Sequence, residues 1–411
     1  MKKKTGLHPT RSKLSILRQL CNLIPNHLVP KLARETGVED RSRTFTPWSH
    51  AVALMFAQLA HSVGLNDVCD ALRLHSGPLS AIRGATPPSR NTLSHANRNR
   101  DAGMAQKLYW AMVEHLGSAH PGFIGGGQAT GCLKRFRRMI HLVDSTTIEL
   151  VANCMDWARH RRRKAAAKCH LKLNLQSFLP NVAIVDTAGE HDAKRARELC
   201  AGISEGEIAI FDKAYLDFDH LGDLDRRGVF WVTRAKENMA YQVIRRLRRP
   251  KNSKVLRDEI IRLEKPSMKA PPQMRRVVAL VEVDGKEREM VFLTNNLDWS
   301  PTTVAELYRS RWQIEVFFKQ IKQTLQMADF LGYNANAVRW QIWTALLVHL
   351  LLRFQGFLSQ WDHSFTRLFT LIRAVLWQKL DLLSLTQIYG TAKRRYRMQA
   401  QPQQAYLPGF G

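Results

Sequence analysis

The spacing of apolar residues changes along the chain. From position 12 to about 118 apolar residues recur at intervals of three and four, as in SKLSILRQLCNLI and HAVALMFAQLAHSVGLNDVCDAL. This spacing predicts amphipathic helices, and no alternating run that would indicate a strand interrupts it. A Gly-rich stretch, PGFIGGGQATG, follows at 121–131 and is typical of a linker. We therefore expect a helical domain over residues 1–120 and a Gly-rich, basic linker over 121–138.

The pattern after the linker predicts an α/β sheet domain over residues 139–236. We expect strands at 139–150, 171–178 and 181–189, a helix near 190–201, a strand at 207–215, a polar helical segment, and a strand at 229–236. Three successive strands followed by alternating helix and strand indicate an α/β fold class.

A second β region and then a long helix complete the pattern. Residues 237–299 contain a basic stretch and strand-like runs, with Asp284 and Gly285 between two runs as a strong hairpin signal. Ser300 and Pro301 have the residue types of an N-cap and a first helical position, so they predict a helix that continues to about Met327. We expect a β-rich insertion over 237–299, a helix completing the core over 300–330, and a helical C-terminal region over 331–411 with a frayed Gln/Pro-rich tail.

The net charge indicates which class of molecule the protein binds. The 411 residues include 62 Lys and Arg against 35 Asp and Glu, a formal net charge of +27. Residues 1–139 alone hold 20 basic and 7 acidic residues. A surplus of this size indicates a polyanionic partner, above all nucleic acid, because each neutralised phosphate requires a nearby cation. A merely soluble basic protein is the alternative.

Several protein classes are disfavoured. The basic residues at 2–4 are followed by no apolar run, so no secretory signal is predicted. The apolar stretch 343–352 contains His349 and is too short to span a bilayer, so we expect a buried helix and no membrane partner. The six cysteines include no CxxC pair, which supports neither a zinc ribbon nor a disulfide framework. We expect reduced thiols in the cytoplasm.

Two basic segments have the chemistry of DNA contacts. Pro87 and Pro88 end one helix, Ser89 is a plausible N-cap of the next, and that helix is expected to expose a basic and polar set. The set consists of Arg90, Asn91, His95, Arg98 and Arg100. The run RHRRRK at 159–164, which includes Arg161 and Arg162, is a candidate phosphate-binding loop. An ordinary solvated surface explains either segment equally well.

Three carboxylates follow apolar strand-like runs: Asp144 after IHLV, Asp186 after NVAIV and Asp212 after EIAIF. Open α/β sheets bind ligands at the carboxyl ends of their strands, and hard cations such as Mg²⁺ prefer carboxylate oxygens. Each Asp alone is more simply explained as a turn residue. The pattern does not decide which of the three would bind a metal.

The helix that begins at Ser300 has one polar stripe. At about 100° per residue, a narrow face carries a phenol, a guanidinium, a carboxylate and two ammonium groups. These belong to Tyr308, Arg311, Glu315, Lys319 and Lys322. The apolar side chains left for packing are Leu307, Ile314, Phe317, Phe318, Ile321 and Leu325. A solvated face with ion pairs at i,i+4 spacing is the alternative to a functional site.

The spacing Tyr308–x2–Arg311–x3–Glu315–x6–Lys322 resembles the Y-R-E-K signature of the insertion-sequence four family of bacterial DDE transposases. VDSTTIEL resembles the family's segment with the first catalytic Asp, and FDKAYLDFDHL resembles the segment with the second. The resemblance covers most of the chain. It implies a ribonuclease-H-like core with a β-rich insertion, flanked by helical N- and C-terminal regions.

The resemblance also implies roles for single residues. It makes Asp144, Asp212 and Glu315 a catalytic triad that binds two Mg²⁺ ions, for which Mn²⁺ can substitute, and it leaves Asp186 without a role. Tyr308, Arg311 and Lys322, with Lys319 on the same stripe, would contact DNA phosphates. Relatives often have Gly after the second Asp where this chain has Ala214, so that turn is expected to differ locally. Trp299 is a candidate to stabilise a flipped base or, equally well, a packing residue.

The function implied is that of a DNA transposase. It would bind terminal inverted repeats and target double-stranded DNA, cleave and transfer strands by a two-metal mechanism, and act as a homodimer in the bacterial cytoplasm, associated with the nucleoid. The alternatives are a metal-dependent DNA nuclease on the same core and a catalytically inactive DNA-binding regulator. The intact carboxylates argue against the inactive form.

Overall fold

The chain folds into two compact units that interleave along the sequence. A computed structural model describes residues 8–38, 44–125, 136–150, 159–161, 164–187, 192–251, 253–283, 285–324 and 331–390. Unit 1 comprises Met1–Ile124, Ile148–Ala167 and Phe318–Arg397. Unit 2 comprises Gly125–Thr147, Lys168–Phe317 and Met398–Gly411. The N-terminal and C-terminal helical regions therefore belong to one unit.

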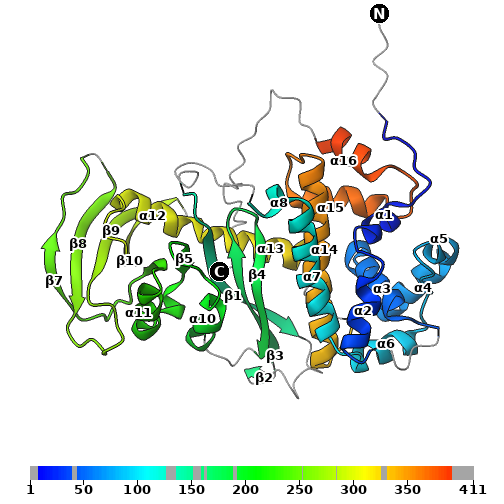
Figure 1. Cartoon of the computed structure of the whole chain (residues 1–411), viewed down its shortest axis with the longest axis horizontal. Helices are drawn as coiled ribbons and strands as arrows, with labels where there is room; N and C mark the ends of the chain where they lie inside the picture. Colours follow the sequence, from blue (N-terminus) through cyan, green and yellow to red (C-terminus); the bar gives the residue numbers. More distant parts are fainter. Residues whose placement is uncertain are drawn as a thin grey trace, which may run out of the picture. The chain divides into compact units, whose positions relative to one another are not determined.

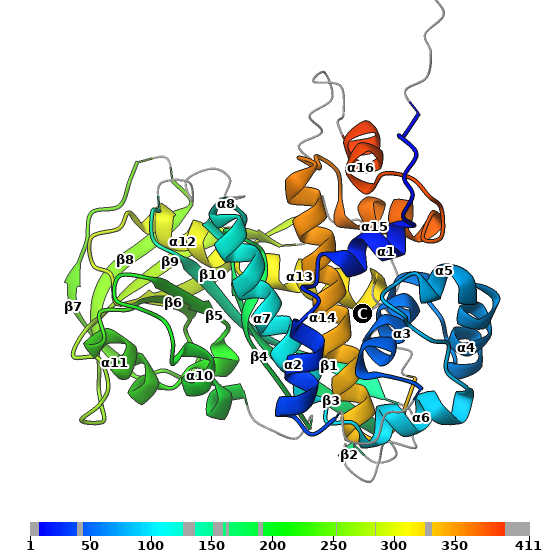
Figure 2. The same ribbon diagram turned by 45° about the vertical axis from the view of Figure 1, so that its right-hand side comes forward.

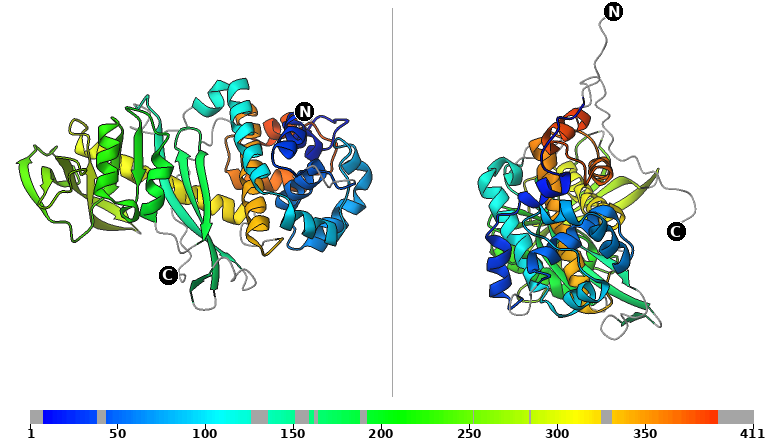
Figure 3. Two further views of the ribbon diagram at one scale, coloured as in Figure 1. Left: turned by 60° about the horizontal axis from the view of Figure 1, so that its bottom comes forward. Right: turned by 90° about the vertical axis from the view of Figure 1, so that its right-hand side faces the viewer.

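Unit 1 is mainly helical (Figure 3). Its N-terminal helices are α1 (Ile16–Asn22), α2 (Leu28–Glu35), α3 (Pro47–Ala60), α4 (Leu65–Leu74), α5 (Ser76–Ser80), α6 (Arg90–Asn99), α7 (Gly103–Ala119) and α8 (Pro121–Gly125). Its C-terminal helices are α14 (Ala335–Leu358), α15 (Phe365–Ala374) and α16 (Leu382–Gly390). The central helix α14 packs against α3, α6 and α7. It is long and apolar enough to cross a membrane, but 78% of its apolar stretch is buried inside the protein, as in a core helix.

Unit 2 is built on a large sheet (Figure 1). Its strands are β1 (Ile140–Leu150), β3 (Lys164–Asn174), β4 (Leu179–Thr187), β5 (Ile208–Phe211), β6 (Phe230–Arg234), β7 (Tyr241–Arg246), β8 (Val255–Leu263), β9 (Met274–Val283) and β10 (Lys286–Thr294). The end of β1 after Thr147 and the start of β3 before Lys168 belong to unit 1. The strands lie in the order β3-β1-β5-β6-β10-β9-β8-β7, with β4 beside β3 and the short β2 (Arg159–Arg161) beside the start of β3. The pairs β1–β5 and β5–β6 are parallel, whereas β6–β10 and the pairs beyond it are antiparallel.

Helices cover both faces of this sheet (Figures 1 and 2). On one face α10 (Asp192–Cys200) and α11 (Phe218–Arg226) pack Leu199 and Leu221 against Phe211 and Trp231, all at most 1% exposed. The other face is covered by α12 (Pro301–Ser310), which packs on β5, β6, β8, β9 and β10. Because both faces are covered, β5 is buried along its whole length and reads as a continuous apolar run.

The predicted α/β class with flanking helical regions is confirmed. The expected hairpin is present because Val283 is opposite Lys286, with Gly285 at φ +70°; Asp284 lies outside the described residues. The strands predicted as an insertion extend the core sheet through the pairing of β10 with β6.

Four expectations about local structure were wrong. Residues 121–125, predicted as linker, form the short helix α8, because Phe123 is buried against Phe354 and Phe357. The basic run at 159–164 is not a loop, since β2 pairs there with the start of β3, seven residues earlier than the strand was expected. The strand predicted at 207–215 ends at Phe211. The long helix after Ser300 divides at Arg311 into α12 and α13 (Trp312–Thr324). Residues 325–330 and the C-terminal tail from 391 lie outside the described residues.

Candidate active site

Asp144 and Asp212 lie side by side on neighbouring parallel strands. The β1–β5 ladder pairs Ile140 with Ile208 and continues to Val143 opposite Phe211, so the next residue on each strand is an aspartate. Neighbouring strands are about 4.8 Å apart, which brings the two carboxylates close together. The strand continues past Asp144 to Leu150, as predicted, and only its pairing with β5 ends before Asp144.

The turn after Asp212 needs no glycine. Lys213–Tyr215 form a single 3₁₀ turn, η3, and Asp212 caps it by accepting a hydrogen bond from the Lys213 backbone N–H at 2.7 Å. Ala214 does not have a positive φ. Tyr215 is buried, and its hydroxyl lies 3.3 Å from His170 Nδ1. The departure from the family pattern at Ala214 therefore leaves the position of Asp212 undisturbed.

The helices α12 and α13 bring three polar side chains to the two aspartates. Tyr308, 7% exposed, donates its hydroxyl to Asp212 Oδ1 at 3.2 Å. Arg311 donates from Nη1 to Asp144 Oδ2 at 2.8 Å and from Nη2 to Glu315 Oε1. The division of the helix at Arg311 leaves the predicted stripe intact at these positions. One guanidinium thus bridges the first and third candidate carboxylates.

The apolar face predicted for this segment is confirmed for its described members. Leu307, Ile314 and Phe317 are fully buried, and Phe318 and Ile321 are 7% and 2% exposed. Leu325 lies outside the described residues. Because these side chains face inward, Tyr308 and Arg311 are held toward the aspartates, whereas Lys319 on the same stripe is exposed.

Burial and the charges of neighbouring side chains determine the pKa values of Asp144, Tyr308 and Arg311. Burial raises the pKa of Asp144 to about 6; Arg311 lowers it, and the nearby carboxylates of Asp212 and Glu315 raise it. Burial raises the pKa of Tyr308, so its phenol stays protonated and donates. Burial alone would lower the pKa of Arg311, but Tyr308, Asp144 and Glu315 raise it. The site therefore concentrates negative charge around one buried cation.

Comparison with known proteins identifies the family of the chain. Residues 135–351, more than half of the chain and the part that carries Asp144, Asp212 and Glu315, match the family model described as "Transposase DDE domain". The chain belongs to this family. Residues 12–82 match a second model, described as a domain of unknown function (DUF4372). The resemblance to bacterial insertion-sequence DDE transposases is thereby confirmed.

Individual relatives carry the same name. The Sinorhizobium fredii protein y4zB, named as a transposase, is 30% identical over 72% of this chain and 80% of its own length. The transposase InsG for insertion sequence element IS4 of Escherichia coli is 24% identical over 45% of this chain and 42% of its own. A piggyBac transposase synaptic complex with hairpin DNA aligns over 90% of this chain and 82% of that chain, with a TM-score of 0.45 and 10% identity, a likeness too low to carry an argument.

The transposase site has the donor set for a hard divalent cation. Three carboxylates supply only oxygen ligands, which suits Mg²⁺ or Mn²⁺, and the DDE domain implies divalent metal dependence in general. Within the described residues, no three Asp, Glu, His or Cys side chains already converge on one point. The guanidinium of Arg311 lies between Asp144 and Glu315 and accounts for this separation. The residues fit the metal by chemistry, with Arg311 neutralising part of their charge.

The other predicted contact residues are distributed over both units. Lys319 is exposed on α13, and Lys322 lies one turn further along the same helix. Arg90 and Arg98 are exposed on α6, whose predicted N-cap Ser89 accepts from Thr92 N–H at 3.2 Å. Arg161 belongs to β2, whereas Arg162 lies outside the described residues.

Arg100 differs from its prediction. It was expected on the exposed face of α6, but it ends that helix, and its guanidinium donates to the backbone carbonyls of Phe45 and Thr46. The guanidinium also stacks over the Phe45 ring, with its carbon 5.3 Å from the ring centroid. Arg100 therefore holds the loop before α3 rather than facing solvent.

A buried ion pair anchors the turn that leads into α12. Arg275 on β9 makes two hydrogen bonds to Asp258 on β8, at 2.8 and 2.7 Å, and both side chains are at most 4% exposed. The same guanidinium donates to the carbonyl of Leu297 at 2.9 Å and to that of Trp299. Because Ser300 then caps α12, this contact fixes the start of the helix that carries Tyr308.

Sequence reasoning missed two residues near the site. Arg234 ends β6 and is close enough to Tyr308 to lower the pKa of its phenol against the effect of burial. The rule that singled out Asp144 and Asp212, a polar residue following an apolar strand, would also have found Arg234. Arg275 had no such signal, because it stands in a run of basic residues that looks exposed. Trp299 packs against Phe136 and Phe230 at ring distances of 5.5 and 5.3 Å, which favours its packing role.

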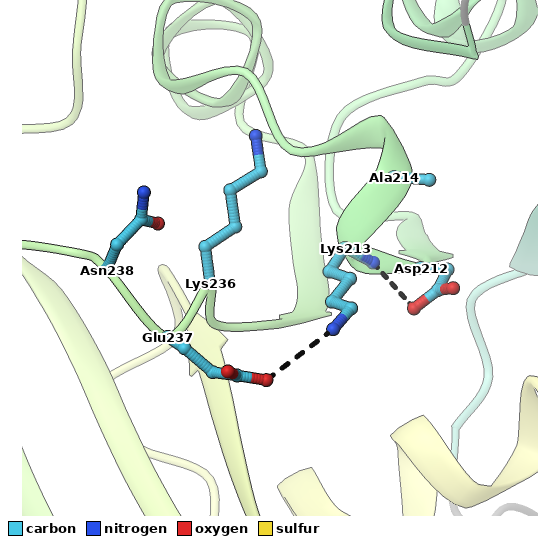
Figure 4. A pocket seen from close by; sticks show the side chains of 6 residues that line it. All are labelled: Asp212, Lys213, Ala214, Lys236, Glu237 and Asn238. Carbon is cyan, nitrogen blue, oxygen red and sulfur yellow. Dashed lines mark hydrogen bonds and ion pairs between the residues drawn. The ribbon is translucent and has the colours of Figure 1, made fainter.

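An open pocket of about 530 Å³ borders Asp212 (Figure 4). It is lined by Asp212, Lys213, Ala214, Lys236, Glu237 and Asn238. Lys213 pairs with Glu237 at 3.9 Å, and Lys236 donates to the carbonyl of Leu216 at 3.1 Å. The second aspartate therefore lines a pocket that is open to solvent.

Proposed function

We propose that this transposase binds the terminal inverted repeats of its element, cleaves DNA strands at the element ends and transfers them to target DNA. The observation that carries the proposal is the register of β1 against β5, which sets Asp144 beside Asp212, together with the contacts of Tyr308 and Arg311 to the same two aspartates. A solvated helix face would not direct its phenol and guanidinium at partly buried carboxylates from two other strands.

Asp144, Asp212 and Glu315 are the proposed catalytic and metal-binding residues, and two Mg²⁺ ions are the proposed cofactors, with Mn²⁺ as a substitute. The chemistry that such ions supply when bound is acidification of the attacking hydroxyl and stabilisation of the leaving oxygen in an in-line displacement. The protein's part is to hold the carboxylates in place. Tyr308 does this for Asp212 through its hydroxyl, and the backbone N–H of Lys213 in the η3 turn donates to the same carboxylate oxygen.

Arg311 is proposed to grip a DNA phosphate near the cleaved bond. Its guanidinium already bridges two carboxylates, and a phosphate accepts the same pair of parallel hydrogen bonds. Lys319 and Lys322 would extend this contact along α13, with Tyr308 at its start. We propose that Arg90 and Arg98, in a DNA-binding domain over residues 1–120, and Arg161 and Arg162 contact DNA elsewhere, and that a homodimer pairs two element ends on the nucleoid.

The test uses the inverted repeats that flank the gene. Purified protein is incubated with Mg²⁺ and a plasmid carrying these ends, beside the variants Asp144→Asn and Glu315→Gln. Glu306→Gln is the matched control, because Glu306 is an exposed carboxylate on α12. We expect cleavage and joining by the wild type and the control, and DNA binding without cleavage by the two site variants.

Other outcomes separate the alternatives. Cleavage without joining would favour a nuclease on the same core. Binding without cleavage by the wild type itself would favour an inactive regulator. Cleavage by Asp144→Asn at the wild-type rate would refute the assignment of the site, whatever the activity of the protein.

A further inference from the structure

The outer edge of the sheet in unit 2 is unusually exposed. β7 is the last strand in the order and pairs only with β8, so one row of its backbone groups has no strand partner (Figure 1). Every residue from Gln242 to Arg246 is exposed, including Val243 at 42% and Ile244 at 49%. Since residues on a strand alternate between two faces, neither face of β7 is covered.

This edge is densely basic. Residues 241–257 contain seven Arg and Lys and no Asp or Glu. Five of the seven fall within 245–251, and we call these residues the basic edge. They are Arg245, Arg246, Arg248, Arg249 and Lys251.

Most of these charges are not neutralised by the protein. Arg246 lies 3.9 Å from Glu259 but is itself 84% exposed. Arg249 donates to the carbonyl of Leu256 at 2.7 Å, a contact that holds the turn after β7 without cancelling charge. Within the described residues Arg245, Arg248 and Lys251 have no carboxylate within ion-pair distance. The basic edge therefore presents a positive potential to solvent.

The basic edge runs from the end of a strand into the turn that follows. Arg245 and Arg246 are the last residues of β7, and Arg248, Arg249 and Lys251 follow within five positions, so their charges are grouped closely enough to meet neighbouring phosphates of a nucleic acid. The pairing with β8 also shifts between Val243 and Arg245, and such a bulge bends an edge strand and turns its side chains outward.

We infer that the basic edge binds the phosphate backbone of duplex DNA independently of base sequence. This rests on the proposed function, which supplies the DNA. Edge strands also carry single charges to prevent pairing between molecules, but one or two suffice for that purpose. Five cations in seven residues, nearly all without an acidic partner, exceed that need and match a polyanion.

The experiment compares DNA affinity as a function of salt. The test variant replaces the four arginines of the basic edge with glutamine. The control variant removes the same charge from exposed residues of unit 2 that have acidic neighbours in sequence. These are Arg197, Lys265, Lys286 and Arg288. Binding to a 30-base-pair duplex is measured between 50 and 300 mM NaCl, once with random sequence and once with the terminal repeat.

Each phosphate contact contributes about 0.9 to the slope of log K against log salt concentration. Loss of four contacts should flatten the slope by about 3 to 4 and weaken binding about tenfold or more, equally for both duplexes, whereas the control should keep the wild-type slope. A variant with all four arginines replaced by lysine keeps the charge and should also keep the slope. If the variant with all four glutamines fails to fold, two double variants replace it: Arg245→Gln/Arg246→Gln and Arg248→Gln/Arg249→Gln. Each should flatten the salt slope by about half as much.

An unchanged salt slope in the glutamine variants would overturn the inference. If these variants also self-associate on gel filtration, the charges of the basic edge serve only to prevent β7 from pairing with another molecule. Loss of affinity for the terminal repeat alone would equally refute sequence-independent binding. If the wild type binds neither duplex, the proposed function itself fails, so the two failures are distinguishable.

Discussion

Of the contacts in the β-rich half of unit 2, the buried ion pair between Arg275 and Asp258 should be the one whose mutation lowers stability most. The variant Arg275→Met keeps the side chain's length and removes its charge and five donors. It leaves the Asp258 carboxylate, 1% exposed in its side chain, without either of its hydrogen bonds. It also leaves the carbonyls of Leu297 and Trp299 without their donor.

Removing one partner of a buried ion pair costs about 3–5 kcal/mol, because the remaining charge stays desolvated and unpaired. At about 1.4 kcal/mol per factor of ten, local opening should become about two to four orders of magnitude more frequent. The cost should be concentrated in β8, β9 and the turn before α12, since these segments meet at Arg275. Function should suffer as well, because the start of α12 positions Tyr308.

Hydrogen exchange is the suitable measurement, since a chain of two compact units need not unfold in one step. Peptides from β8 and β9 should exchange faster in Arg275→Met, whereas α7 and α14 should not change. The double variant Arg275→Met/Asp258→Leu should recover most of the protection, because it removes the stranded carboxylate. Lys254→Gln, which breaks an exposed pair with Glu287, should have no measurable effect. Equal exchange in Arg275→Met and the wild type would refute this account of the pair.

Three further predictions concern other parts of the molecule. A Cβ at Gly222 would lie 1.7 Å from the carbonyl oxygen of Lys269, so Gly222→Ala should destabilise unit 2 by about 1–3 kcal/mol in urea unfolding; an unchanged midpoint would mean that the 264–273 loop moves freely. Burial lowers the pKa of His50 to about 3, so folding keeps it neutral. The free energy of unfolding should therefore fall by up to about 1.4 kcal/mol for each pH unit below about 6.5. The variant His50→Gln should lose the part of this pH dependence that one proton contributes. The same pH dependence in the variant and the wild type would contradict the lowered pKa of His50. Tyr308→Phe removes only the hydroxyl that holds Asp212, so cleavage should fall about tenfold while the thermal midpoint stays within a few degrees; full activity would deny the hydroxyl a role.

Local sequence patterns were sufficient to predict where several helices and strands begin or end. Ser89 and Ser300 were predicted as N-caps, and both accept a hydrogen bond from the backbone three residues later. The hairpin at Gly285 was equally predictable, since a two-residue turn requires positive φ. In each case the residue type that allows the prediction and the hydrogen bond or turn that it forms lie within four residues of each other in the sequence.

Long-range geometry was beyond the sequence pattern. The apolar runs before Asp144, Asp186 and Asp212 are alike, and only the β1–β5 register distinguishes the first and third as neighbours. The family resemblance supplied what periodicity could not. The division of the helix at Arg311 was also missed, because arginine is an ordinary helical residue and the carboxylate that Arg311 contacts lies 167 positions away in the sequence.

The arginines show why net charge alone says little about binding. Arg100 and Arg275 donate to backbone carbonyls, and Arg311 is surrounded by carboxylates, so none of these three is available to a phosphate without breaking an internal contact. Arg245, Arg246 and Arg248 of the basic edge, in contrast, are exposed at the end of β7 and in the turn after it. Both kinds count equally toward the +27, yet only the exposed kind can release counterions when DNA binds. The salt dependence of DNA binding should therefore follow the exposed set, with Arg311 joining it only if a phosphate at the active site displaces one of its carboxylate partners.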